Sequence, residues 1–223
     1  MTMSLFIQAM VKFFSGLLLM GLLLFAPAGT MAYPEGQRLM VLLFVPMFIA
    51  GLVMMAKSPS LLAKRLNMKE KLGEQVQVIL ASCAMFVCGF LAAGLSFRFD
   101  VLMLPAWVSW AACALFLMAY ALYAQVLREN AFLSRTIEIQ ENQHVVDTGL
   151  YGVVRHPMYT ATILMFLSMP AVLGSALAFV IFLAYPVLIA ARIRNEETVL
   201  EAGLDGYADY KKRVKYRLIP FVW

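Results

Sequence analysis

Long, mostly apolar runs of residues dominate the first 127 residues and leave this chain few possible folds. Four such runs lie at residues 5–27, 39–56, 76–97 and 101–127. Each is close to the ~20 apolar residues that a helix needs to cross the hydrocarbon core of a bilayer. Only 14% of the residues are charged, against about a quarter in an average soluble domain. The sequence therefore predicts an all-α integral membrane protein. The first run could instead be a cleaved signal peptide, but a retained helix is favoured.

The last apolar stretch, residues 159–193, is too long for one comfortable span and short for two. Pro170 and Gly174 lie near its middle, and proline followed by glycine is typical of a turn. We therefore predict a tight helical hairpin. The whole chain then has about six helical segments, four spans and a C-terminal hairpin.

The basic residues test this reading because lysine and arginine are enriched in cytoplasmic loops. Fifteen of the 18 lie in three segments, residues 57–71, 128–155 and 192–217. The last two segments can share a side only if the stretch between them crosses the membrane an even number of times, as a hairpin does. We expect a multi-pass protein of the cytoplasmic membrane with both termini in the cytoplasm. It would divide into N-terminal helices (1–127) and a C-terminal region (128–223) with a small cytoplasmic part.

Other site classes find little support. The net charge of +5 is explained by topology, and no basic stripe with interleaved aromatics indicates nucleic-acid binding. Cys83, Cys88 and Cys113 fall within apolar runs without the CxxC spacing of a metal site, so we expect small core residues and no metal. Oligomeric state is left open.

Polar residues gather at both ends of the predicted hairpin. At one end, Arg155-His156-Pro157 opens a helix, with proline at a position that suits it. At the other end, Arg192 and Glu196 are four residues apart and share a helix face near the membrane boundary. Taken singly, each motif is also explained by a capped helix start or a positive-inside anchor. Because a hairpin brings its two ends together, we expect a pocket between them.

The order of these motifs resembles the isoprenylcysteine carboxyl methyltransferase family, including its bacterial members. The resemblance covers residues 130–220. It rests on Asn130-Ala131-Phe132-Leu133-Ser134, the segment from Val145 to Tyr151, Arg155-His156-Pro157-Met158-Tyr159, Glu196-Glu197, the segment from Gly206 to Val214, and Leu218-Ile219-Pro220.

The resemblance implies an S-adenosylmethionine site and a substrate contact. The implied cofactor-binding residues are Gln143, His144, Val145, Val146, Tyr151, His156, Pro157, Met158, Tyr159 and Glu196. The implied substrate contact is Arg192, our candidate catalytic residue. The roles of Arg155 and Glu197 are left open.

The chemistry of these residue types suits such a role. A methyl sulfonium is already activated, so transfer to a carboxylate or thiolate needs alignment more than a metal or a strong base. A guanidinium can hold an anion through two parallel hydrogen bonds. We therefore expect methyl transfer to a lipophilic or lipidated anionic substrate, with carboxylate O-methylation first and a thiol second. Two alternatives remain open: an NADPH-dependent membrane reductase resembling the sterol reductases, and a non-enzymatic membrane protein on the same scaffold.

Overall fold

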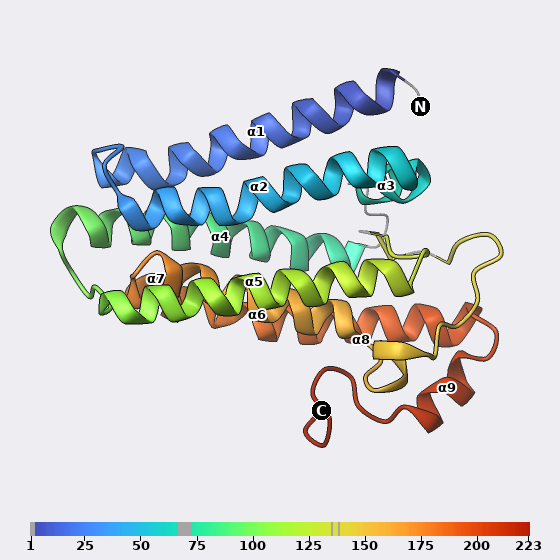
Figure 1. The fold of residues 1–223 in the computed structure, drawn as a ribbon. Coiled ribbons are helices and arrows are strands. Elements are labelled where there is room, and N and C mark those ends of the chain that lie inside the picture. The colour runs from blue at the N-terminus through green and yellow to red at the C-terminus, as the bar shows by residue number, and fades with distance from the viewer. Residues whose placement is uncertain (1–2, 67–72, 135, 138) are drawn as a thin grey trace.

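The computed structural model describes residues 3–66, 73–134, 136–137 and 139–223, and within these ranges the chain is a bundle of helices (Figure 1). The long N-terminal helices are α1 (Met3–Ala28), α2 (Pro34–Lys57), α4 (Gly73–Phe99) and α5 (Ala106–Glu129). They are followed by α6 (Pro157–Val172), α7 (Ala176–Phe182) and α8 (Ala184–Gly203). Three short elements complete the described fold: α3 (Pro59–Leu66), the 3₁₀ turn η1 (Gly149–Gly152) and α9 (Tyr207–Arg213).

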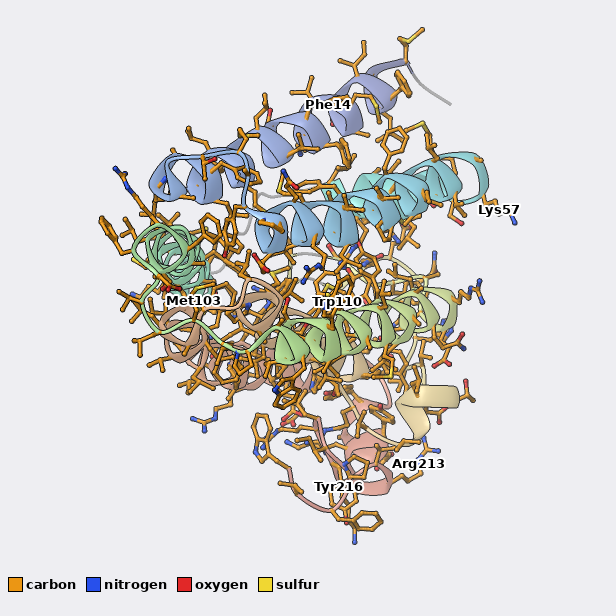
Figure 2. The ribbon with its side chains drawn as sticks, turned by 60° about the vertical axis from the view of Figure 1, so that its left-hand side comes forward. Phe14, Lys57, Met103, Trp110, Arg213 and Tyr216 are labelled. Atoms are coloured by element: carbon orange, nitrogen blue, oxygen red, sulfur yellow. The ribbon has the colours of Figure 1, made fainter. Side chains whose placement is uncertain are left out.

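The predicted membrane class is confirmed by the length and composition of these helices. Five described segments are long and apolar enough to cross a bilayer: α1, α2, α4, α5 and the α7–α8 pair. Large apolar side chains point away from the bundle, such as Phe14 on α1 and Trp110 on α5 (Figure 2). Such a surface is costly in water and suited to lipid. Trp107 and Trp110 both lie in the first turns of α5, where tryptophan marks the membrane–water boundary.

The predicted hairpin is confirmed, with α6 as one arm and α7–α8 as the other. The chain reverses at residues 173–175, where Gly174 has a positive φ of 70° that favours glycine. Neighbouring elements bind the turn: the Tyr33 hydroxyl donates to the Leu173 carbonyl (2.7 Å), and the Leu104 amide donates to the Gly174 carbonyl (2.7 Å). The hairpin turn therefore lies level with the α4–α5 link. We call this end of the bundle the turn end.

The limits of the hairpin arms differ from those predicted. The first arm begins at Pro157 rather than at residue 159, and the second continues ten residues beyond 193, to Gly203. A helix can continue beyond the membrane boundary. The change from apolar to polar residues therefore indicates where the membrane span ends, and the helix itself extends further. The second arm is also interrupted at Leu183. Pro186 explains this break, because proline cannot donate to the carbonyl four residues earlier.

Glycines on α4 allow the hairpin and α1 to approach it closely. A Cβ on Gly89 would lie 2.2 Å from the Phe182 ring, and one on Gly94 would lie 2.5 Å from the Leu24 carbonyl oxygen. Without a hydrophobic driving force inside lipid, helices associate through such close packing at small residues. The hairpin is therefore held against the core of the bundle.

The described parts of the three basic segments gather at the other end, where α6 begins, which we call the site end; Lys69, Lys71 and Arg135 lie outside the described residues. Arg65 of α3 lies within 3.5 Å of the Ser134 carbonyl, and the Lys64 ammonium lies 5.7 Å from the Phe132 ring centroid. The C-terminal tail reaches the same end, because the Thr160 hydroxyl donates to the Leu218 carbonyl (2.8 Å). All three segments can therefore face one compartment, as the charge argument requires.

Reporter fusions test which compartment this is. We expect a fusion after Arg38 to report the outer side, and fusions after Ser134 and Trp223 to report the cytoplasm, because the basic segments favour retention inside. An alkaline phosphatase and fluorescent protein pair at each site measures both states. A C-terminal fusion that reports the outer side would contradict the assignment.

Candidate functional site

The chain between α5 and α6 is anchored to the end of α5 by a glycine turn. Gly149 has a φ of 59°, and a Cβ there would lie 2.6 Å from the Glu129 carboxylate. That carboxylate accepts the Leu150 amide (2.8 Å). The result is the short turn η1, which buries Tyr151 against the rest of the C-terminal region.

Glu197 is the centre of a buried ionic network. Its Oε1 accepts from Arg155 Nε (2.8 Å) and lies 3.2 Å from His156 Nε2. Its Oε2 accepts from Arg217 Nε (3.0 Å) and Nη2 (2.8 Å). Arg155 and Glu197 are 6% and 3% exposed, so both charges are removed from water. One carboxylate therefore joins the start of α6, the middle of α8 and the C-terminal tail.

Arg155 also binds backbone carbonyls of the C-terminal tail. Its Nη1 donates to the carbonyls of Val214 (2.7 Å) and Lys215 (2.8 Å). The amides of Arg155 and His156 donate to the carbonyls of Tyr216 and Arg217 (2.9 Å each). The roles of Arg155 and Glu197, open at the level of sequence, are thus structural in this arrangement.

Next to the Glu197 network, a second set of linked hydrogen bonds crosses the base of the hairpin. The Tyr159 hydroxyl donates to Glu196 Oε2 (2.5 Å) and accepts from Arg192 Nε (2.9 Å). Arg192 Nη1 lies 3.2 Å from Gln75 Oε1 on α4. Tyr159 comes from α6, whereas Arg192 and Glu196 come from α8, so the predicted meeting of the two hairpin ends is observed.

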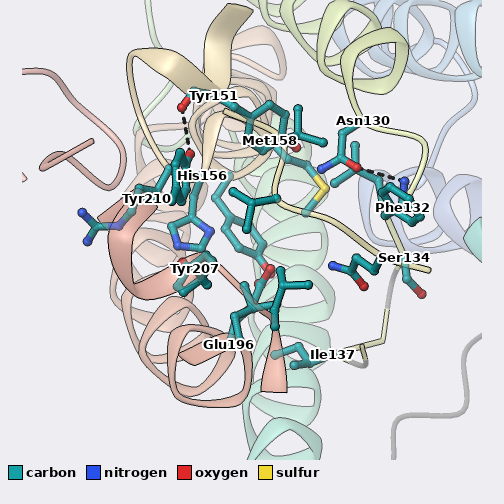
Figure 3. A pocket seen from close by; sticks show the side chains of 18 of the residues that line it. Asn130, Phe132, Ser134, Ile137, Tyr151, His156, Met158, Glu196, Tyr207 and Tyr210 are labelled. Carbon is teal, nitrogen blue, oxygen red and sulfur yellow. Dashed lines mark hydrogen bonds between the residues drawn. The ribbon is translucent and has the colours of Figure 1, made fainter. Parts of the chain in front are cut away.

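These groups form part of the wall of a pocket at the site end (Figure 3). Side chains from the segment before α6, from α8 and from α9 converge on it. The sequence-predicted residues in this wall are Gln143, His144, Val145, Val146, Tyr151, His156, Met158, Tyr159, Arg192 and Glu196. Pro157 is not in the wall and is instead buried as the first residue of α6.

Other residues of the wall were not predicted. They come from the chain after α5, from the end of α8 and from α9: Asn130, Phe132, Leu133, Ser134, Thr136, Ile137, Leu200, Leu204, Tyr207 and Tyr210, together with Arg155. Leu200 and Leu204 continue the four-residue spacing of Arg192 and Glu196, which could have revealed them. Tyr207 and Tyr210, like residues 130–134, belong to segments that carry the family resemblance but for which the resemblance implied no site role.

The two α9 tyrosines differ in what their hydroxyls do. The Tyr210 hydroxyl donates to the Tyr151 carbonyl (2.8 Å) and so joins α9 to the turn before α6. The Tyr207 hydroxyl is buried and has no hydrogen-bond partner among the described residues. Burial raises the pKa of both phenols, so both stay neutral and able to donate at physiological pH. Tyr207 thus offers the pocket an unused donor.

The described residues contain no group of three His, Cys, Asp or Glu side chains arranged to hold a metal ion. The pocket wall instead offers aromatic faces, the Glu196 carboxylate, the guanidinium groups of Arg155 and Arg192, and the buried Tyr207 hydroxyl. Such a wall is suited to an organic ligand with hydroxyl or cationic groups.

Fold and site together define a multi-pass membrane protein with a polar pocket at the base of a helical hairpin. The model of the isoprenylcysteine carboxyl methyltransferase (ICMT) family matches residues 110–202, a range that contains the hairpin and most of the pocket. The family resemblance noted in the sequence is therefore confirmed over this region.

One solved structure shares the fold of this chain, and two proteins share part of its sequence. The structure of the eukaryotic intramembrane Ras methyltransferase ICMT aligns with 84% of this chain and 75% of its own, with a TM-score of 0.51 and 18% identity, which shows a shared fold. Mouse Delta(14)-sterol reductase TM7SF2 is 33% identical over 91 residues, and the cobalt-zinc-cadmium resistance protein CzcN of Cupriavidus metallidurans is 32% identical over 75. These matches span only 22% and 35% of the two relatives' lengths.

Removing the carboxylate of Glu197 tests the ionic network. Glu197→Ala leaves Arg155 and Arg217 without their shared acceptor, and breaking a buried pair typically costs about 3–5 kcal/mol. We expect a correspondingly lower free energy of unfolding, measured by denaturant titration in micelles. Glu201→Ala is the matched control, because Glu201 meets Lys211 near the surface and such pairs contribute about 1 kcal/mol or less. Equal effects of the two substitutions would contradict a central role for Glu197.

Proposed function

We propose that this protein transfers a methyl group from S-adenosylmethionine to a lipophilic anionic substrate at the cytoplasmic boundary of the membrane. The observation that carries the proposal is the Arg192–Tyr159–Glu196 chain, which crosses the hairpin base inside a region that matches the ICMT family. The methyltransferase named in the structural comparison supports the same reaction class.

The pocket residues fit this cofactor. Glu196 can accept from ribose hydroxyls or complement a sulfonium charge while it binds the Tyr159 hydroxyl. The aromatic ring of Tyr159 offers a face to a cation or to adenine. Leu200 and Leu204 add apolar surface to the wall. The unpartnered hydroxyl of Tyr207 is a donor that a polar ligand would satisfy.

Arg192 is proposed to hold the substrate. When bound, S-adenosylmethionine supplies an electrophilic methyl group, and transfer to a carboxylate oxygen yields an ester and a neutral thioether without net proton transfer. The chain's own residues then need only to align the reactants and exclude water. Arg192 lies one helical turn before Glu196 on α8, nearer the turn end and therefore deeper in the membrane, and Tyr159 Oη holds its Nε. The anionic head of a lipophilic substrate would meet its guanidinium there.

A carboxylate fits Arg192 better than a thiolate does. A guanidinium can give a carboxylate two parallel hydrogen bonds, whereas a single sulfur offers a weaker acceptor. Carboxylate O-methylation is therefore the reaction that we propose first, and methylation of a lipophilic thiol second.

The match to a sterol reductase makes an NADPH-dependent membrane reductase the second candidate. Titration of the purified protein separates the two functions. We expect S-adenosylmethionine to bind and NADPH to leave it undisplaced, as measured by isothermal calorimetry with each ligand alone and in competition. Binding of NADPH without S-adenosylmethionine would favour the reductase, and binding of neither would favour a non-enzymatic role.

Variants of the polar chain test the location of the cofactor. Glu196→Ala and Tyr159→Phe remove the two partners of one hydrogen bond, so each should weaken S-adenosylmethionine binding by roughly tenfold or more. Glu201→Ala, on the exposed part of α8, is the control and should bind normally. Unchanged affinity in both pocket variants, with normal unfolding curves, would show that the cofactor binds elsewhere.

Replacing Arg192 with lysine tests its proposed role in catalysis. Lysine keeps the charge but loses the paired donors, and loss of a charge-assisted contact in a desolvated site typically lowers the rate about a hundredfold or more. We expect low turnover with retained cofactor binding, measured by methyl transfer to an acceptor found by screening lipophilic carboxylates and thiols. Near-normal turnover would mean that Arg192 is an interfacial anchor.

The two α9 tyrosines provide a matched pair. Tyr207→Phe should lower cofactor affinity about three- to tenfold without loss of stability, because its hydroxyl has no described protein partner to lose. Tyr210→Phe should instead lower the free energy of unfolding by about 1–3 kcal/mol, because the Tyr151 carbonyl loses its donor. The reverse pattern would contradict the role assigned to Tyr207.

A further inference from the structure

The last residues of the chain form an apolar loop that the bundle leaves uncovered. After α9 the chain turns back alongside the helices, so the C-terminus lies nearer the middle of the bundle than α9 does (Figure 1). The Phe221 and Val222 side chains are 87% and 74% exposed, and Ile219 is also exposed. Leu218 is buried and Trp223 packs against the main core, so the loop is fastened on its inner side.

Most of the amides of this loop are hydrogen-bonded within the loop. The amides of residues 217, 218 and 219 all donate to one main-chain carboxylate oxygen of Trp223 (2.9–3.1 Å), so the loop itself binds this negative charge. The amides of Val222 and Trp223 donate to the Ile219 carbonyl (3.1 Å each), and Pro220 has no N–H. In lipid an unpaired backbone group has no solvent partner, so these bonds lower the cost of placing the loop at the membrane surface. The Phe221 amide has no backbone acceptor among the described residues, so the loop backbone belongs at the headgroup level and only its apolar side chains reach the acyl chains.

The loop also lies at membrane depth. α5 and α6 are level at the turn end, but α6 has 16 residues and α5 has 24. At 1.5 Å per residue, the start of α6 therefore lies about 12 Å nearer the middle of the bilayer than the charged end of α5. Thr160, in the first turn of α6, holds the Leu218 carbonyl (2.8 Å) and so holds the loop at this depth.

We propose that residues 217–223 insert into the leaflet at the site end, with Phe221 and Val222 among the acyl chains. The charges nearby suit this placement. Lys215, just before the loop, is exposed where its ammonium group can reach a lipid phosphate, and Lys212 of α9 is also exposed, although it pairs with Asp209 (2.8 Å). Arg217 is turned inward, to Glu197 and over the Trp223 ring at 5.1 Å, so its charge is kept from the acyl chains. This inference does not depend on the proposed enzymatic function.

A photoactivatable lipid tests the insertion with the unmodified chain. The protein is reconstituted into phosphatidylcholine vesicles that contain a lipid with a diazirine on its acyl chain, irradiated, digested with trypsin and analysed by mass spectrometry. Cleavage after Arg217 releases residues 218–223 separately from α9. We expect label on residues 219–222 as on the exposed residues of α1, and several-fold less on residues 207–213.

Two substitutions of Phe221 complete the test, since its exposed side chain contributes little packing. Phe221→Leu should keep the labelling of residues 218–223, and Phe221→Glu should lower it several-fold. Absence of label on residues 218–223 in the wild type, with normal labelling of α1, would overturn the proposal and indicate water or a second protein over the loop. Equal labelling of residues 218–223 in both variants would overturn it as well.

Discussion

The C-terminal half of the structure depends on one buried carboxylate. Glu197, on α8, accepts hydrogen bonds from Arg155, just before α6, and from Arg217 in the C-terminal tail. The His156 ring also lies beside it, with Nε2 at 3.2 Å. A buried guanidinium without an anionic partner is strongly destabilising, and Glu197 is the carboxylate that both arginines contact. The network therefore favours the one arrangement of α6, α8 and the tail in which both arginines reach Glu197. It also sets the rotation of α8. Successive helical residues point about 100° apart, so burying Glu197 against Arg155 leaves Glu196 facing the pocket and Tyr159.

The hairpin determines where this pocket lies relative to the membrane. Its turn is held level with the α4–α5 link, while α6 is eight residues shorter than α5, so the start of α6 lies about 12 Å nearer the turn end than the charged end of α5. The polar residues of the hairpin base therefore lie nearer the turn end than the charged end of α5 does. An arginine at such depth needs partners, and Tyr159 and Gln75 are among those of Arg192. This position is consistent with the lipophilic substrate that we propose.

Much of this architecture could be predicted from the sequence, for identifiable reasons. The apolar runs gave the spans, and the parity of the basic segments together with Pro170 and Gly174 gave the hairpin. The motif resemblance located ten of the residues that line the pocket. What it could not reveal was the Glu197 network, because pairing between residues 20 and 42 positions apart leaves no periodic signal in a single sequence. The interruption at Leu183 was readable from Pro186 but was missed, because the long apolar run suggested a continuous helix.

The central claim is that the base of the hairpin binds S-adenosylmethionine, and photochemical mapping tests it most directly. Wild-type protein in lipid nanodiscs is irradiated with radiolabelled S-adenosylmethionine, and the cross-linked residues are identified after proteolysis. Because Tyr151, Tyr159 and Tyr207 line the pocket, the account predicts label on residues 143–159 or 196–210 that excess unlabelled S-adenosylhomocysteine removes. Displaceable label confined to residues 3–127, or no displaceable label at all, would contradict it.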